Sequence, residues 1–479
     1  MGGALQEHHE RGDIMTRLIE SIRLWVAAHR FLRARVLTGA ALRMALMLIA
    51  YARTGTQIMT QGDTASYLIS GRNLLQHGQF ASGGSPEIDR TPGYPLFAML
   101  TGMMQDNVLV TVLAQIVVST LALLLIGRIA ELVFPGTRAV YYATWLYALE
   151  PISILYTVRL MPETLFVLLL LCVIERLLSF YVSGKLASVA IAGVFLTAAT
   201  FVRPVSYYLI FALAIGLAFT APRARQLWWK VPAMLLVCTL PWLAAWQLRN
   251  RIETGYSGFS SIVEKNLYFY QSAEVTAELA HISLGAQQAR LGYLDDASYL
   301  AVHPEQRLWT QAQRLAYMHS QALQILSAHR ALYLRTHFAG VAVVAFTPCA
   351  TELLQLLRLY PDAAEMPHRI LNEGVLSSLL RVLQAEPVTG TVMILLELVL
   401  LAFYAAAIYG LCRGSGKILP KLLLAAVALY FLLISGGAQA VGRYRVPVMP
   451  ELCIVAGGGL AVLRKERGGA ANGSAHVAL

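Results

Sequence analysis

Residues 162–183 read PETLFVLLLLCVIERLLSFYVS, a run dominated by apolar side chains. A helix of this length crosses the hydrocarbon core of a bilayer, which needs about 20 predominantly apolar residues. Similar runs recur near residues 36–52, 108–134, 139–158, 186–202, 205–221, 229–246, 391–411, 418–435 and 446–463. Because only lipid can solvate so many apolar surfaces, we expect an all-α integral membrane protein with about ten to twelve transmembrane helices.

The composition indicates the same class of protein. Of the 479 residues, 57% are hydrophobic and only 14% are charged, against roughly 25% charged in soluble domains. These values exclude a soluble globular enzyme. The formal charge of +11 would suggest a nucleic-acid partner in a soluble protein. Here it fits cytoplasmic loops that follow the positive-inside rule, so we expect contact with membrane lipids and no nucleic acid.

The positions of arginine and lysine predict the orientation. Residues 1–35 lack a cleavable signal and combine arginines with apolar residues at helical spacing, as in a cytoplasmic amphipathic segment on the inner leaflet. With this end inside, the short loops between the early spans and the tail 464–479 place their basic residues in the cytoplasm. Residues 336–357 are apolar but contain Pro348, and we interpret them as interfacial or re-entrant.

This orientation divides the chain into a membrane module, residues 36–246, and C-terminal transmembrane helices, residues 391–463. Two long polar stretches fall on the outer side, the first outer loop 53–92 and the segment 247–390. The second contains a predicted amphipathic helix near 304–329, which we expect to pack on its own domain. Its apolar stripe consists of Leu308, Ala312, Leu315, Met318 and Leu326. Chemistry is expected on these two stretches.

Several kinds of site are not supported. Five cysteines lie singly in or beside apolar segments without CxxC spacing, which indicates buried small hydrophobes rather than disulfides or zinc ligands. Residues 414–417, GSGK, lack the rest of a Walker A loop. No ligand spacing demands a divalent metal, although one between acidic residues stays open. We therefore expect that no cofactor is required.

Acidic residues stand out because they are rare. Asp63, Glu87 and Asp89 share the first outer loop, where carboxylates suit acid/base chemistry on a sugar or lipid head group. Asp63 also precedes a predicted helix, so its alternative role is an N-cap. Glu150 precedes Pro151 in an apolar run and should point into the bundle, since a lipid-facing charge is costly.

Short motifs along the chain carry a family resemblance. They are DTASYL at 63–68, NLL at 73–75, DRTPGYPLF at 89–97, PETLF at 162–166, FVRP at 201–204, RN at 249–250 and RYRVP at 443–447. Their order resembles that of the GT-C superfamily of polyprenyl-phosphate-sugar-dependent glycosyltransferases. The nearest branch is the bacterial relatives of the dolichyl-phosphate-mannose protein mannosyltransferases and of the aminoarabinose transferase of lipid A.

The resemblance implies a GT-C-like bundle with two long outer loops and an inverting glycosyltransferase activity. A sugar would move from a polyprenyl-phosphate-linked donor to a lipid, glycan or protein acceptor. Transfer would take place on the extracytoplasmic, or periplasmic, side of a cell inner membrane. The match carries the role of general base to Asp63 and a supporting catalytic role to Asp89, with Glu87 as the alternative to Asp89.

Further residues of these motifs are implied in binding. Arginines at the outer membrane edge would stabilise the leaving phosphate. The candidates are Arg90, Arg203, Arg443 and Arg445. The residues expected to position the substrate are Tyr67, Glu87, Tyr94, Glu163 and Arg249. Each arginine could instead snorkel to lipid phosphate, and the glutamate could interact with a helix N-terminus.

Two other classes of function would share these features. A transporter or flippase of lipid-linked sugars would also need outer-edge arginines and intramembrane acids. Such proteins contain internal repeats, and the sequence has none that we detect. A GT-C-like oligosaccharide ligase or polymerase would differ mainly in using a pyrophosphate-linked donor.

Overall fold

The computed structural model describes residues 30–60, 62–221, 227–359, 380, 383, 384 and 386–475. Most of the predicted amphipathic segment 1–35 lies outside the described residues, as does the end of the tail 464–479. The predictions for these two segments stay untested there.

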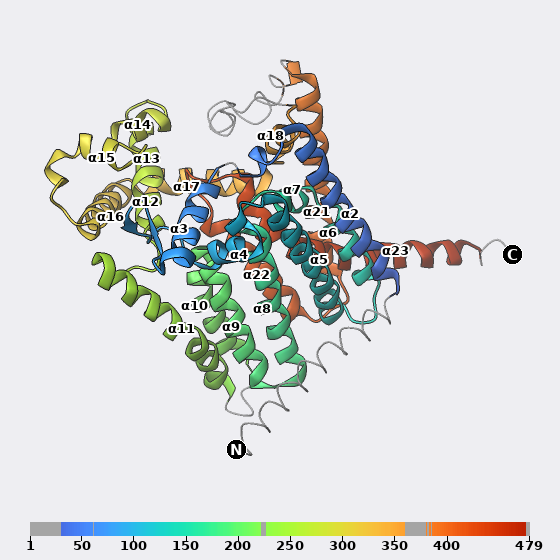
Figure 1. Ribbon diagram of the computed structural model, residues 1–479. Helices are drawn as coiled ribbons and strands as arrows, with labels where there is room; N and C mark the ends of the chain where they lie inside the picture. The colour runs from blue at the N-terminus through green and yellow to red at the C-terminus, as the bar shows by residue number, and fades with distance from the viewer. Residues whose placement is uncertain are drawn as a thin grey trace.

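The described chain is almost entirely helical (Figure 1). Its α-helices are α2 (Arg30–Thr54), α3 (Thr64–His77), α4 (Gly93–Thr101), α5 (Val108–Val133), α6 (Ala139–Leu149), α7 (Pro151–Val158), α8 (Glu163–Ser183), α9 (Leu186–Val202), α10 (Tyr207–Thr220), α11 (Leu227–Thr254), α12 (Ile262–Asn266), α13 (Ala273–Leu279), α14 (Leu284–Arg290), α15 (Asp296–Val302), α16 (Gln311–Ala328), α17 (Arg330–Phe346), α18 (Ala350–Leu356), α21 (Pro387–Arg413), α22 (Ile418–Ile434) and α23 (Met449–Ala475). The short 3₁₀ helices are η1 (Gln57–Thr60), η2 (Met103–Gln105), η3 (Pro204–Ser206), η6 (Pro304–Gln306) and η7 (Gly442–Val448). A π-helical turn, η5, spans Leu267–Ser272. Strands β1 (Ala81–Ser82) and β2 (Ser85–Pro86) form an antiparallel hairpin within the first outer loop.

Six described helices are long and apolar enough to cross a membrane, or seven if the bent pair α17 and α18 counts as one span. They lie in α2, α5, α8, α11, α21 and Gly442–Arg464, which joins η7 to α23. Three apolar helices are shorter, namely Leu186–Val202, Pro204–Thr220 and Ile418–Ile434. The chain is an all-α membrane protein, and the count of ten to twelve spans stays a prediction.

The apolar run 139–158 is not one helix, so the prediction of a single span there is wrong. Helix α6 ends at Leu149 and α7 begins at Pro151, because a residue before proline disfavours helical backbone. Glu150 is extended at this break, and its carboxylate accepts hydrogen bonds from the N–H groups of Ile152 and Ser153 at 3.1 and 2.6 Å. The side chain is buried, which confirms that Glu150 points into the bundle.

The predicted interfacial or re-entrant segment 336–357 is bent. Helices α17 and α18 meet at 53° around Pro348, a geometry shared by broken spans and re-entrant loops. Arg445 donates from Nη1 to the carbonyls of Val344 and Ala345 at 2.8 and 2.9 Å. These carbonyls lie in the last turn of α17, where helical partners run out. The buried guanidinium therefore stabilises the bend.

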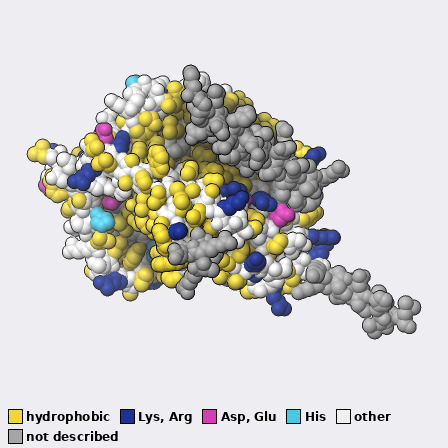
Figure 2. All heavy atoms as spheres, turned by 90° about the horizontal axis from the view of Figure 1, so that it is seen from below, with side chains coloured by type: hydrophobic (Ala, Val, Ile, Leu, Met, Phe, Trp, Pro, Cys, Tyr) yellow, Lys and Arg dark blue, Asp and Glu magenta, His cyan; other side chains and the backbone are white. Residues whose placement is uncertain are grey.

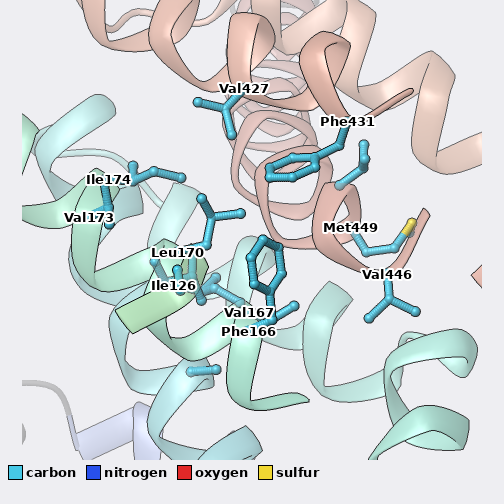
Figure 3. Packing of buried hydrophobic residues seen from close by; sticks show 14 of the residues in the cluster. Ile126, Phe166, Val167, Leu170, Val173, Ile174, Val427, Phe431, Val446 and Met449 are labelled. Atoms are coloured by element: carbon cyan, nitrogen blue, oxygen red, sulfur yellow. The ribbon is translucent and has the colours of Figure 1, made fainter. Parts of the chain in front are cut away.

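The main hydrophobic core extends through most of the bundle, and one part of it lies between α8 and the C-terminal helices (Figure 3). Phe166 of α8 meets Phe431 of α22 edge to face, with ring centroids 5.6 Å apart and planes at 90°. Val167 and Leu170 extend this contact on the α8 side, and Val446 belongs to the same buried cluster. This packing joins the first half of the chain to η7.

One face of the molecule is largely apolar (Figure 2). Large hydrophobic side chains are exposed along the peripheral helices, including Phe219 of α10 (78%), Val237 of α11 (69%) and Leu398 of α21 (57%). Exposed apolar area on this scale is unstable in water and suits lipid contact.

Helices α12 to α16 form a separate lobe at one end of the bundle, upper left in Figure 1. The lobe has its own cluster of buried aromatic and aliphatic side chains. Helix α16 begins with a capping box at Thr310 and buries Leu315, Met318 and Leu326, as the predicted stripe requires. Leu308 precedes the helix and is 97% exposed, so its inclusion in the stripe is wrong.

Helices α21 and α23 depend on a close glycine contact. A Cβ at Gly410 would lie 2.0 Å from the carbonyl oxygen of Val455. We expect Gly410→Leu to separate the two helices and to destabilise the fold by about 1–3 kcal/mol. The measurement is the apparent melting temperature of the solubilised protein. Gly216→Leu is the control, since a Cβ there meets nothing within 4 Å. Equal melting temperatures for the two variants would contradict the expectation.

Candidate functional site

Five charged residues from distant parts of the chain form one cluster. Asp63 lies at 3.1 Å from both Arg90 and Arg443, through its two carboxylate oxygens. Glu163 lies at 3.3 Å from Arg443 and from Arg203, through Oε1. We call these residues the arginine–carboxylate cluster. It brings together the first outer loop, the start of α8, the end of α9 and η7.

The carboxylate of Asp63 does not cap a helix. Asp63 occupies the N-cap position of α3, but its side chain makes no capping hydrogen bond. Only its backbone carbonyl contacts the first turn, where it accepts hydrogen bonds from the Ser66 backbone N–H and hydroxyl. The N-cap alternative is therefore wrong for the side chain. Burial alone would raise the pKa of Asp63, but the guanidiniums of Arg90 and Arg443 hold it below its usual range, so the group stays ionised.

Arg90 is fixed by α3 as well as by Asp63. Its Nε donates to the Ser66 hydroxyl at 3.0 Å and its Nη1 to the Tyr67 hydroxyl at 3.2 Å. The guanidinium also lies 4.6 Å from the centroid of the Tyr67 ring, a cation–π arrangement. Arg90, which is predicted to bind the donor phosphate, is thus held in place beside Asp63, the predicted base.

Glu163 is fully buried in the first turn of α8. Neither carboxylate oxygen accepts a well-oriented hydrogen bond, although both arginines lie at ion-pair distance. Glu163 is thus paired with two arginines. A buried carboxylate with open acceptor capacity could also receive hydroxyl donors from a ligand.

A glycine explains how the first outer loop reaches this cluster. A Cβ at Gly93, the first residue of α4, would lie 2.6 Å from the carbonyl oxygen of Phe201 in α9. Only glycine permits this approach of two backbones. The contact brings the loop that carries Arg90 next to the end of α9, where Arg203 follows.

Asp89 and Glu87 lie in the same loop but make different contacts. The Asp89 carboxylate accepts hydrogen bonds from Ser261 and from Lys265, which ties the loop to α12. Glu87 accepts from the backbone N–H groups of Asp89 and Arg90 at 2.7 and 3.0 Å and closes a turn. Burial and the nearby Asp89 raise the pKa of Glu87. Neither forms an ion pair with the arginines of the cluster among the described contacts.

Two further predicted residues, Arg249 and Tyr94, support the first outer loop, and a third, Arg445, does not contact the site. Arg249 donates to the carbonyls of Glu87 and Phe80, both at 2.7 Å, and so clamps the hairpin. Tyr94 is buried, donates to Gln115 at 2.9 Å and meets the Tyr67 ring edge to face. Arg445 is committed to the carbonyls of α17 and lies outside the cluster.

Sequence reasoning missed Tyr444 and Lys265. The Tyr444 ring centroid lies 5.3 Å from the Arg443 guanidinium and 5.8 Å from that of Arg203. Tyr444 is the middle residue of the RYR motif, and this position could have indicated that it lies at the site. Lys265 pairs with Asp89 across a long sequence separation, and no local pattern indicates that contact.

Within the part of the chain that the structure describes, no three His, Cys, Asp or Glu side chains gather as a metal site. That no cofactor is required stays a prediction.

No protein-family model and no curated protein sequence matches the chain. Among solved structures, the chain is similar to the archaeal oligosaccharyltransferase AglB from Archaeoglobus fulgidus, in complex with an inhibitory peptide and a dolichol-phosphate. The TM-score is 0.51 and the sequence identity 11%, over 92% of this chain and 51% of that chain. This chain thus spans about half the length of its neighbour. The likeness supports a GT-C-like membrane fold.

The hairpin clamp generates a prediction. Arg249→Ala removes two hydrogen bonds to the carbonyls of Phe80 and Glu87, so residues 80–90 should open more often. Hydrogen–deuterium exchange mass spectrometry should show faster amide exchange in this segment. Arg251→Ala, at an exposed position on the same helix, is the matched control and should leave the exchange unchanged. Unaltered exchange in Arg249→Ala would refute the clamp.

Proposed function

We propose that this chain is an inverting glycosyltransferase that moves a sugar from a polyprenyl-phosphate-linked donor to an acceptor at the extracytoplasmic face of a cell inner membrane. The observation that supports this most is Asp63, an ionised carboxylate held between two guanidiniums next to a third arginine and a buried glutamate. A base and phosphate-binding groups in one place are what such a transfer needs. The GT-C-like fold is consistent with it.

Asp63 would be the general base. The acceptor hydroxyl attacks the anomeric carbon, the bond from that carbon to the phosphate oxygen breaks, and Asp63 takes the hydroxyl proton. The leaving polyprenyl phosphate gains one negative charge in this step. Attack from the face opposite the phosphate inverts the anomeric centre, and no covalent enzyme intermediate is required.

The arginines would serve two anions in turn. Without donor, Arg90 and Arg443 neutralise Asp63, which makes this carboxylate a weak base. A phosphate that binds the same guanidiniums would draw them away from Asp63, and the carboxylate would become more basic when the donor is bound. Arg203 would complete the phosphate site. We leave Arg445 out of this set, because its Nη1 already donates to two carbonyls.

Other residues would orient the substrate. Glu163, whose Oε2 has no hydrogen-bond partner, would accept a hydrogen bond from a hydroxyl of the donor sugar. The Tyr67 hydroxyl, next to Arg90, could contact the phosphate. We assign Asp89 a positioning role, because its contacts to Ser261 and Lys265 fix the loop that carries Arg90.

The donor's polyprenyl tail would enter sideways from the bilayer. A small, partly open pocket lies between α7, α21 and the start of α23. Its lining includes Leu396, Val399 and Phe403 of α21 and Met449, which follows directly after η7. Glu150 and Arg445 also line this pocket, so a tail that entered there would pass beside the bend between α17 and α18.

A second candidate is an oligosaccharide ligase that uses a lipid-linked oligosaccharide. The structural neighbour is named as an oligosaccharyltransferase and was solved with a peptide and a dolichol-phosphate. A pyrophosphate-linked donor would need more cationic partners than a monophosphate. Comparing the two donor types in one transfer assay separates the candidates.

The central test is Asp63→Asn. The purified, reconstituted protein is supplied with a polyprenyl-phosphate sugar and a panel of acceptors, and product formation is followed by mass spectrometry. Loss of the base should lower the transfer rate by about 10²–10⁴-fold. Asp106→Asn is the matched control, since Asp106 pairs with Arg72 at the surface. Transfer by folded Asp63→Asn at the parent rate would disprove the assignment.

The pH profile provides a second test. The pKa of Asp63 is lowered by Arg90 and Arg443, and a base acts only when deprotonated, so kcat/KM should fall only below the ordinary carboxyl range. In Arg90→Gln, one of the two positive charges that lower the pKa of Asp63 is lost, while the burial that raises this pKa remains. The acidic limb of the kcat/KM profile should therefore move to higher pH. Arg203→Gln should lose rate with an unmoved limb, because Arg203 pairs with Glu163 instead. An identical acidic limb in the parent and Arg90→Gln would exclude Asp63 as the titrating base.

A further inference from the structure

The π-helical turn η5 connects the α12–α16 lobe to the segment that carries Arg443. Gln271, buried in this turn, donates from Nε2 to the Gly436 carbonyl at 3.3 Å and to Gln439 at 2.7 Å. Gln288 donates to the carbonyl of Phe269 at 3.0 Å and supports the turn from α14. π-helical turns are rare and frequently lie at functional sites. The lobe is thus anchored beside η7.

Two tyrosines form an open aromatic surface at this anchor. Tyr270 of η5 and Tyr293 have ring centroids 5.4 Å apart at 83°, and their hydroxyls are hydrogen-bonded to each other. The ring centroid of Phe269 lies 5.4 Å from that of Tyr293. Tyr293 remains 42% exposed, so this pair leaves ring surface free.

The backbone before Tyr293 is shaped to hold this position. Gly292 has φ +72°, and a Cβ there would lie 2.5 Å from Cα of Tyr299. A side chain is therefore excluded both by conformation and by contact. The backbone at Gly292 packs closely against α15, and this contact holds Tyr293 next to η5.

The tyrosine pair belongs to the turn that contacts the segment leading into η7. Tyr270 precedes Gln271, whose partner Gln439 is four residues before Arg443 in the chain. Burial raises the pKa of Tyr270, with further contributions from Tyr293 and then from Tyr444 and Asp63. This agrees with the place beside η7 that the contacts of Gln271 give to the turn.

We propose that Tyr270 and Tyr293 form the acceptor subsite and that the acceptor presents a sugar ring to them. This inference rests on the proposed transfer reaction, since the acceptor hydroxyl must reach Asp63. A pyranose has C–H faces that pack on an aromatic ring and peripheral hydroxyls that pair with tyrosine hydroxyls. Sites of this type combine aromatic surface with a few polar groups that fix orientation. A glycan fits this surface better than a bare lipid chain, which would leave the tyrosine hydroxyls without a ligand partner.

The test measures binding without catalysis. The full chain in lipid nanodiscs, free of sugar-based detergent, is examined by saturation-transfer NMR with chitotriose, mannotriose and maltotriose, and with a Ser/Thr-rich peptide. At least one trisaccharide should receive saturation from the parent protein. Its affinity should fall by about tenfold in Tyr293→Ala and in Tyr270→Ala. Leu294→Ala, at an 85% exposed neighbour, is the control and should bind as the parent does.

Each contrary outcome is informative. The acceptor assignment is overturned if no trisaccharide binds, if binding does not depend on either tyrosine, or if only the peptide binds with tyrosine dependence. Asp63→Asn should retain trisaccharide binding while losing transfer. Retained binding together with parental transfer in Asp63→Asn would remove the proposed base and leave the tyrosine subsite standing, so the two proposals can fail separately.

Discussion

The contact between Asp63 and Arg443 spans 380 positions of sequence and joins the first outer loop to η7, directly before the last long helix. Asp63 also pairs with Arg90, and Arg443 also pairs with Glu163. Glu163 in turn pairs with Arg203. Glu163 is fully buried and the three arginines are largely shielded from water, and such charges are stable only when they are paired. Removing one member would leave its partners uncompensated. The cluster therefore constrains four separate elements to meet at one point.

The fold class could be predicted because lipid imposes a simple requirement on sequence. Apolar runs of sufficient length gave the helices α5, α8 and α21 with nearly their observed bounds. The break at Glu150 could have been predicted less easily. A proline after a charged residue in an apolar run is compatible with a kink as well as with a stop, and the extended backbone of Glu150 shows that the helix stops here.

The candidate site could be predicted in part. The motifs indicated Asp63, Arg90, Arg203, Glu163 and Arg443, and the structure brings these five together. Arg443 and Arg445 could not be told apart by sequence, because they are separated by one residue in a tight helix. Only the fold directs one guanidinium to Asp63 and the other to the carbonyls of α17. Likewise, Asp89 binds Lys265, a contact between segments that no local pattern connects.

The charge count of the cluster has a consequence for turnover under the proposed reaction. Three guanidiniums and two carboxylates leave one net positive charge, which a singly charged donor phosphodiester would neutralise. After transfer the phosphate carries two negative charges while Asp63 carries the proton, so the site is still neutral. Once that proton escapes to water, the site holds one excess negative charge and repels the lipid product. Deprotonation of Asp63 would thus reset the base and expel the spent carrier in a single event.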